Sequence, residues 1–319
     1  MRIRKAQPTA SDVHVSRPLT NISVAYVQQE TKYIATQVFP TVPVPKQADQ
    51  YFVYTRADWL RDEAKVRAPA TESAGGGFNI GTDTYFCKKW AWHKDVDDDT
   101  RANSDPGINP DADATKFVTQ MLLTRREVQW AASYFVTGVW GSEGTPATLW
   151  DVSTSDPISD VETQTLAMES GTGFRPNVLV VSPHVHKALK NHPDIVDRIK
   201  YTQKGIVTAD LLAELFEVEL YLIARAVVNT AIEGATEATD YIVGKNALLV
   251  YKAPNPSLMV PSGGYTFAWT GLLGAGAAAN RIKRFRMEEL GADRVEGEMA
   301  WDQKLVAADL GYLFLAAVS

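Results

Sequence analysis

The chain is poor in cysteine and has no long apolar segment. One cysteine, Cys87, occurs in 319 residues, which excludes an internal disulfide framework and a cysteine-based zinc site. No run of about 18 apolar residues is present, so no membrane-spanning helix is expected. The N-terminal MRIRKAQPTASD lacks the apolar core of a secretory signal peptide. We therefore expect a protein that is made in the cytoplasm and has no membrane partner.

An excess of positive charge is also lacking. The chain has 32 lysine and arginine residues against 38 aspartate and glutamate residues, a formal net charge of -6. Small basic clusters lie near its two ends, at Arg2, Arg4 and Lys5 and at Arg281, Lys283, Arg284 and Arg286. Proteins that read a DNA sequence usually carry a basic stripe. The sequence argues against such reading, although an acidic chain could still enclose DNA through weak contacts.

Familiar enzyme signatures are missing. The sequence contains no GxSxG elbow, P-loop or HExxH motif. Gly274, Gly276 and Ala279 imitate a dinucleotide fingerprint, but NRIKRFRME follows and alternates like a strand where the fingerprint needs a helix. We interpret these glycines as a surface loop. Cys87 lies in a strand-like run, which favours a packed thiol over a nucleophile.

Two clusters invite a metal-site hypothesis and fail it. The acidic run DVDDD at 95–99 would place Thr100 and Pro106 where a calcium loop needs glycine and glutamate, so we predict a solvated loop. His184 and His186 are two residues apart and face different sides of a helix. We therefore predict no catalytic, cofactor-binding or metal-ligating residues.

Residues 1–47 have no sustained hydrophobic period and contain the prolines Pro8, Pro18, Pro40, Pro43 and Pro45. Proline fixes φ and biases the residue before it toward extended backbone. We predict an arm that lies on another surface, because this segment cannot form a core alone.

Two strand-like runs follow, YFVYT at 51–55 and TYFCKKWAW at 84–92, joined by 28 charged and glycine-bearing residues. Hairpin loops usually have about 2–5 residues, and an isolated two-stranded ribbon is marginally stable. We therefore predict a hairpin that projects from the body and is covered by a neighbouring subunit. Trp59, Trp90 and Trp92 lie in or next to it and are predicted interface anchors; packing within the chain is the alternative.

The clearest helix begins at Asn109, a capping residue, and Pro110, which suits the first helical position. Its predicted buried face follows steps of four and three residues, at Phe117, Met121, Thr124, Val128, Ala131, Phe135 and Gly138. A length on the order of 40 Å suits a structural spine. After a break at 141–160, we predict helices at 183–191, from 193 and at 209–216. Predicted strands lie at 177–181, 218–223, 241–243, 248–252, 265–269, 281–287 and 305–318.

This order of elements resembles the major capsid protein of tailed phages, whose Hong Kong 97-type fold is shared with encapsulins. The similar stretches are LTNISVAYVQQETKYIATQVFPTVPVPKQADQYFVY at 19–54, ESAGGGF at 72–78, TYFCKKWAWHKDVDDD at 84–99, PNVLVVSPHVHKALKNHPDIVDRIK at 176–200 and RVEGEMAWDQKLVAADLGYLF at 294–314. They cover nearly the whole chain. Each motif alone is weakly specific, and their order carries the resemblance.

The resemblance implies an α+β fold with five parts: an N-arm (1–47), an E-loop hairpin (48–95), a spine helix with the peripheral domain (96–170), an axial domain (171–250) and strands returning to both domains (251–319). It also implies subunit-interface residues in the hairpin, the arm and the neighbouring strand. The candidates are Trp59, Arg61, Lys65, Arg67, Phe78, Trp90, Trp92, Phe39 and Val42.

The function implied by the resemblance is self-assembly into hexamers and pentamers of an icosahedral virion shell that encloses double-stranded DNA. The expected partners are further copies of the chain, a portal, possibly a decoration protein, and a separate scaffolding protein, because the arm starts almost at Met1. An encapsulin-like shell is the first alternative, but encapsulins typically begin with a cargo-binding helix and not with a proline-broken arm. A soluble α/β enzyme built on 170–250 is the second, and it leaves the arm and hairpin unexplained.

Overall fold

The computed structural model describes residues 28–104, 108–199, 207–256, 260–271 and 280–319. Its α-helices are α2 (Ala35–Val38), α3 (Arg56–Trp59), α4 (Asp98–Ala102), α5 (Pro110–Tyr134), α6 (Pro157–Thr172), α7 (Pro183–Asn191), α8 (Pro193–Ile199) and α9 (Ala209–Leu215). Short 3-10 turns are η2 (Glu30–Lys32), η3 (Glu288–Leu290) and η4 (Ala308–Leu310). The Gly274–Ala279 segment predicted as a loop lies outside the described residues.

The strands form two five-stranded sheets and two ribbons among the described residues. The first sheet has the order β1-β11-β13-β12, with β4 also paired to β13, and the second has the order β5-β14-β10-β6-β7. The ribbons are β2-β3 and β8-β9. The strand bounds are β1 (Thr41–Val44), β2 (Ala48–Tyr54), β3 (Ile80–Phe86), β4 (Lys88–Asp97), β5 (Ser142–Gly144), β6 (Val178–Val181), β7 (Leu220–Ile223), β8 (Val227–Asn229), β9 (Thr239–Tyr241), β10 (Ala247–Val250), β11 (Gly264–Trp269), β12 (Asn280–Met287), β13 (Ala292–Leu305) and β14 (Gly311–Phe314).

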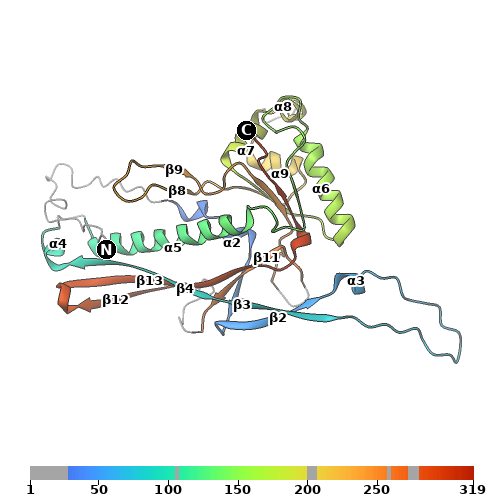
Figure 1. The fold of residues 1–319 in the computed structure, drawn as a ribbon, viewed down its shortest axis with the longest axis horizontal. Coiled ribbons are helices and arrows are strands. Elements are labelled where there is room, and N and C mark those ends of the chain that lie inside the picture. Colours follow the sequence, from blue (N-terminus) through green and yellow to red (C-terminus); the bar gives the residue numbers. More distant parts are fainter. Residues whose placement is uncertain (1–27, 105–107, 200–206, 257–259, 272–279) are drawn as a thin grey trace.

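The long helix α5 lies along the first sheet (Figure 1). Its start is as predicted: the Asn109 side chain accepts a hydrogen bond from Ala112 N, and Pro110 opens the first turn. A Cβ at Gly297 of β13 would come within 2.5 Å of Val118 Cγ1. Glycine at this position therefore allows the close approach of helix and strand.

The predicted buried face of α5 was only partly right, because Ala131 and Phe135 are buried as predicted but the face is set differently over most of the helix. The residues that it buries include Ala114, Val118, Leu122, Leu123, Trp130 and Tyr134, and Phe117 is exposed. Apolar residues occupy two neighbouring faces of this helix, so periodicity alone could not choose between them. The sheet decides, because Val118 and Leu122 pack with Met299 and Trp301 of β13.

The second sheet is the core of a compact α/β unit with helices α6, α7 and α9 around it (Figure 1). Strands β6 and β10 are completely buried and pair antiparallel. The predicted helices at 183–191, from 193 and at 209–216 are confirmed to within a residue, and Ser182 and Thr208 cap two of them. Helix α6 and strand β13 were missed. The predicted strand 305–318 is wrong in most of its length, since strand pairing there is confined to β14.

Residues 33–44 of the predicted arm lie on the body of their own subunit and join its core. Ile34, Ala35 and Val38 are buried, and β1 pairs in parallel with β11 at the edge of the first sheet. An edge strand tolerates Pro43, which has no N–H to donate. This part of the segment is therefore covered by its own subunit, whereas residues 1–27 lie outside the described structure.

Candidate assembly surfaces

The ribbon β2-β3 and its connection project away from the body (Figure 1). The strands pair antiparallel from Ala48 opposite Phe86 to Tyr54 opposite Ile80. Their root is anchored to the body, because the rings of Tyr51 and Tyr85 pack on Phe267 of β11 with centroids 5.5 and 4.6 Å apart. The prediction of a projecting hairpin is confirmed for residues 48–86.

The outer end of the ribbon has a small organised cluster. The rings of Tyr54, Trp59 and Phe78 lie 5.2–6.1 Å apart between centroids. The Asp58 carboxylate accepts hydrogen bonds from Asn79 N and Nδ2 at 2.9 and 3.0 Å, which ties α3 to the start of β3. The predicted residues Trp59 and Phe78 therefore meet, and both remain about half exposed.

Most of the connection beyond this cluster is exposed, including the predicted residues Arg61, Lys65 and Arg67. Arg61 lies 3.6 Å from Asp58 and 3.5 Å from Glu63. Large apolar side chains are exposed along the ribbon and connection, at Phe52, Leu60, Val66, Phe78, Ile80 and Phe86. Several exposed apolar side chains on a projecting element are typical of a protein–protein contact.

Trp90 and Trp92 do not belong to the projecting hairpin, which corrects the boundary 48–95. Cys87 N donates to Gln47 O at 2.8 Å, and from Lys88 onward the chain pairs with β13 as β4. Trp90 stacks on Trp301 with centroids 5.6 Å apart and lies under the guanidinium of Arg125. Trp92 is 42% exposed and keeps a surface that a partner can contact.

Phe39 is not a surface residue, so its prediction as an interface residue was wrong. It is 0% exposed, and its ring lies 4.7–6.3 Å from those of Trp130, Tyr134 and Trp140. The VFPTVPVPK pattern concealed this role because the phenylalanine directly precedes the prolines. Val42, three residues later, is partly exposed on the edge strand β1.

Cys87 is a packed thiol, as predicted. Its side chain is fully buried, and Sγ lies 3.5 Å from Phe267 O. Burial raises the pKa of the thiol to about 12, because a thiolate is poorly solvated there. A reactive nucleophile needs the opposite shift.

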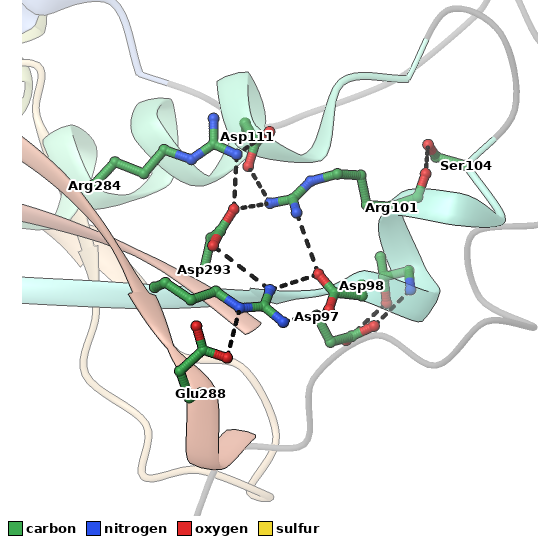
Figure 2. Close-up of polar contacts among 10 residues, drawn as sticks. Asp97, Asp98, Arg101, Ser104, Asp111, Arg284, Glu288 and Asp293 are labelled. Carbon is green, nitrogen blue, oxygen red and sulfur yellow. Dashed lines mark hydrogen bonds and ion pairs between the residues drawn. The ribbon is translucent and has the colours of Figure 1, made fainter. Parts of the chain in front are cut away.

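The acidic run at 95–99 is not the solvated loop that we expected. Figure 2 shows Asp98, Arg101, Asp111, Arg284 and Asp293 meeting where α4, α5, β12 and β13 converge. Arg101 lies 3.0 Å from both Asp111 and Asp293. Hydrogen bonds from Arg286 hold the pKa of Asp98 below its usual range. The sequence signal was the matching basic cluster at 281–286, which supplies the counter-charges.

A second charged group lies on the same sheet. Glu298 of β13 is 2% exposed and is surrounded by Lys89, Arg281 and Lys283. Burial alone would raise the pKa of this carboxyl, but hydrogen bonds from the three cations outweigh burial and bring the pKa to about 2. The two charged groups together tie β4, β12 and β13 into one rigid plate.

Two of the described histidines, His186 and His192, serve ordinary packing and hydrogen bonding. His192 is buried with Nε2 3.0 Å from Ser155 Oγ, and His186 Nδ1 lies 3.1 Å from Tyr221 OH. Within the described ranges, no three histidine, cysteine or acidic residues are grouped as a metal site would need. No helix in these ranges has both the length and the apolar character needed to cross a membrane.

The chain is similar to phage proteins over almost its entire length. Residues 143–255 match the family model "Phage major capsid protein E". The major capsid protein of Burkholderia phage BcepMu is 26% identical over 306 residues, covering 92% of this chain and 94% of the relative. The major capsid protein of Pseudomonas phage JBD67 is 27% identical over 311 residues, covering 94% and 96%.

Solved structures share the fold. The crystal structure of a phage-related protein from Bordetella bronchiseptica has a TM-score of 0.70 at 24% identity, covering 91% of this chain and 93% of that one. The capsid of cyanophage P-SCSP1u has a TM-score of 0.60 at 10% identity, covering 100% and 97%. An encapsulin complex from Synechococcus elongatus has a TM-score of 0.55 at 10% identity, covering 95% of each. The chain is thus similar in sequence to phage major capsid proteins over more than nine tenths of its length, and its α+β fold is the Hong Kong 97-type fold of phage capsids.

Proposed function

We propose that this chain is a phage major capsid protein that forms hexamers and pentamers of a closed icosahedral shell around double-stranded DNA, with the hairpin of each subunit lying across a neighbour. The observation that carries the proposal is the apolar surface of the hairpin. Val66 is fully exposed and Phe52 is 63% exposed, although burying such a side chain is worth roughly 1.5–3 kcal/mol. A neighbouring copy is the cover that a shell supplies.

The contact is heterologous: the hairpin of one subunit meets a different surface of the next, and such contacts close into rings when the rotation closes. We propose Trp59, Arg61, Lys65, Arg67 and Phe78 as hairpin residues of this contact. Trp90, Trp92 and Val42 are proposed as body residues, and Trp92 is the most exposed of the three.

The proposed partners follow the same reasoning. A portal, a separate scaffolding protein and a decoration protein are expected of a DNA-filled capsid, whose subunits are made in the host cytoplasm. A net charge of -6 favours loose proximity to the packaged DNA over tight binding. The capsid identity argues against an enzymatic role, and the encapsulin alternative has support from the shared fold alone.

Expression of the chain alone and with its neighbouring genes tests the proposal. Negative-stain microscopy should show closed shells several hundred ångströms across, because heterologous contacts propagate until the shell closes. A uniform small oligomer whose melting temperature rises with a small ligand would contradict the proposal and favour the enzyme alternative.

A further inference from the structure

Residues 28–39, here called the strap, are fastened to the spine helix α5 by polar side chains. Gln120, Thr124 and Glu127 lie at positions i, i+4 and i+7 of α5 and therefore share one face. Tyr33 OH lies 2.9 Å from Thr124 Oγ1 and accepts a hydrogen bond from Gln120 Nε2 at 2.5 Å. These polar contacts add to the apolar packing of the strap, in which Phe39 lies against Trp130 and Tyr134 of the same helix.

Glu127 makes the innermost of these contacts. Its carboxylate accepts hydrogen bonds from Ile34 N at 3.1 Å and Ala35 N at 3.0 Å. These two N–H groups stand at the start of α2, where the helix offers them no internal acceptor. The side chain of Glu127 is 1% exposed, so the strap seals a carboxylate that is open to water only if the strap lifts.

The groups around Glu127 compensate the negative charge of its carboxylate poorly. Among the described residues the carboxylate makes no ion pair within 4 Å. Arg126 on the same helix attracts it from a greater distance, but that guanidinium is itself largely buried. Two titratable groups of the strap face this region. The Glu30 carboxylate attracts the Arg126 guanidinium, and the phenol of Tyr33 is neutral. Burial is therefore the dominant electrostatic influence on Glu127.

We propose that Glu127 is a positioning residue that makes attachment of the strap depend on a proton: the strap closes more tightly when this carboxyl is protonated and loosens when it is ionised. Ile34 N and Ala35 N bond different oxygens of the carboxylate. The protonated group therefore keeps a full acceptor for one of them and weakens the contact with the other, but it avoids the larger cost of burying an unpaired charge. The proposal does not depend on shell formation.

The direction of the pH dependence follows from linkage. Burial raises the pKa of Glu127 from its ordinary 4.5 to about 7 while the strap is closed, and a lifted strap returns the group to water. A group whose pKa is raised in the closed state stabilises closure at low pH, and this stabilisation is lost as the pH rises through the raised value. The strap therefore opens more often at pH 8 than at pH 6, by about tenfold.

Hydrogen exchange of the full-length chain tests the proposal. Protection factors for the 33–39 backbone, corrected for intrinsic exchange, should fall about tenfold between pH 6 and pH 8 in the wild type. In Glu127→Gln they should change less than about twofold, because the amide does not titrate. The buried strands β6 and β10 serve as an internal reference for global opening.

The matched control is Glu162→Gln, which makes the same chemical change at an exposed position on α6 and should keep the wild-type profile. If the Glu127→Gln variant does not fold, the pH dependence of protection in the wild-type strap is by itself the test of the proposal. A wild-type strap whose protection is flat or rises with pH would overturn the proposal. Failure to assemble shells would leave this profile unchanged, so the two proposals fail separately.

Discussion

Deletion of Asp62–Gly77 should yield a soluble, folded subunit that no longer closes shells. These residues add little to their own subunit: among the described contacts they make, Glu63 pairs with Arg61 and Arg67 bonds Thr71 within the same connection. The cluster of Tyr54, Trp59 and Phe78 lies outside the deleted range. The deletion should therefore weaken the contact with the neighbouring subunit and leave the fold of its own subunit intact.

The comparison needs two measurements on the same preparation. Thermal unfolding should place the melting temperature of the deletion within about 2–4 °C of the wild type, while negative stain shows no closed shells. A control replaces 62–77 with a glycine-serine linker of equal length, which keeps the reach of the hairpin and removes its side chains. Normal shells from either variant would show that these residues are not the assembly contact.

Phe39→Ala should be the most destabilising of the substitutions considered. Its ring lies between those of Trp130, Tyr134 and Trp140, where helix α5 meets the second sheet. Removal of a fully buried phenylalanine costs about 3–5 kcal/mol. The free energy of unfolding in urea, measured on unassembled subunits, gives this value directly.

Phe52→Ala is the matched control, because the same atoms are removed from a side chain that is 63% exposed on the hairpin. This substitution should change the free energy of unfolding of the subunit by no more than about 0.5 kcal/mol. Its main effect should be a reduced yield of assembled shells. Equal destabilisation by the two substitutions would refute both the burial of Phe39 in the subunit and the exposure of the hairpin.

The sequence predicted the local elements best where their signals are chemical. Asn109-Pro110, Ser182-Pro183 and Thr208 each place a capping oxygen before an acceptable first turn, and each opens a helix as expected. The long hairpin could be predicted because a connection of 28 residues, many of them charged, is too long for an internal loop. These features depend on near neighbours in the chain.

The sequence did not predict which distant segments of the chain pair with each other. Trp90 was assigned to the hairpin, yet β4 pairs with β13, about 200 residues away. Phe39 looked like part of an arm because its burial depends on Trp130 and Trp140. Glu127 carried no motif at all, since its partners are backbone N–H groups more than 90 residues distant.

A cryo-EM reconstruction of the assembled particle tests most directly whether the hairpin is covered by a sibling subunit. The map should show Phe52, Leu60, Val66 and Phe78 packed against the body of a second copy, with the root of the hairpin still on Phe267 of its own subunit. A particle in which these side chains remain in solvent, or in which each hairpin folds back on its own body, would contradict the account.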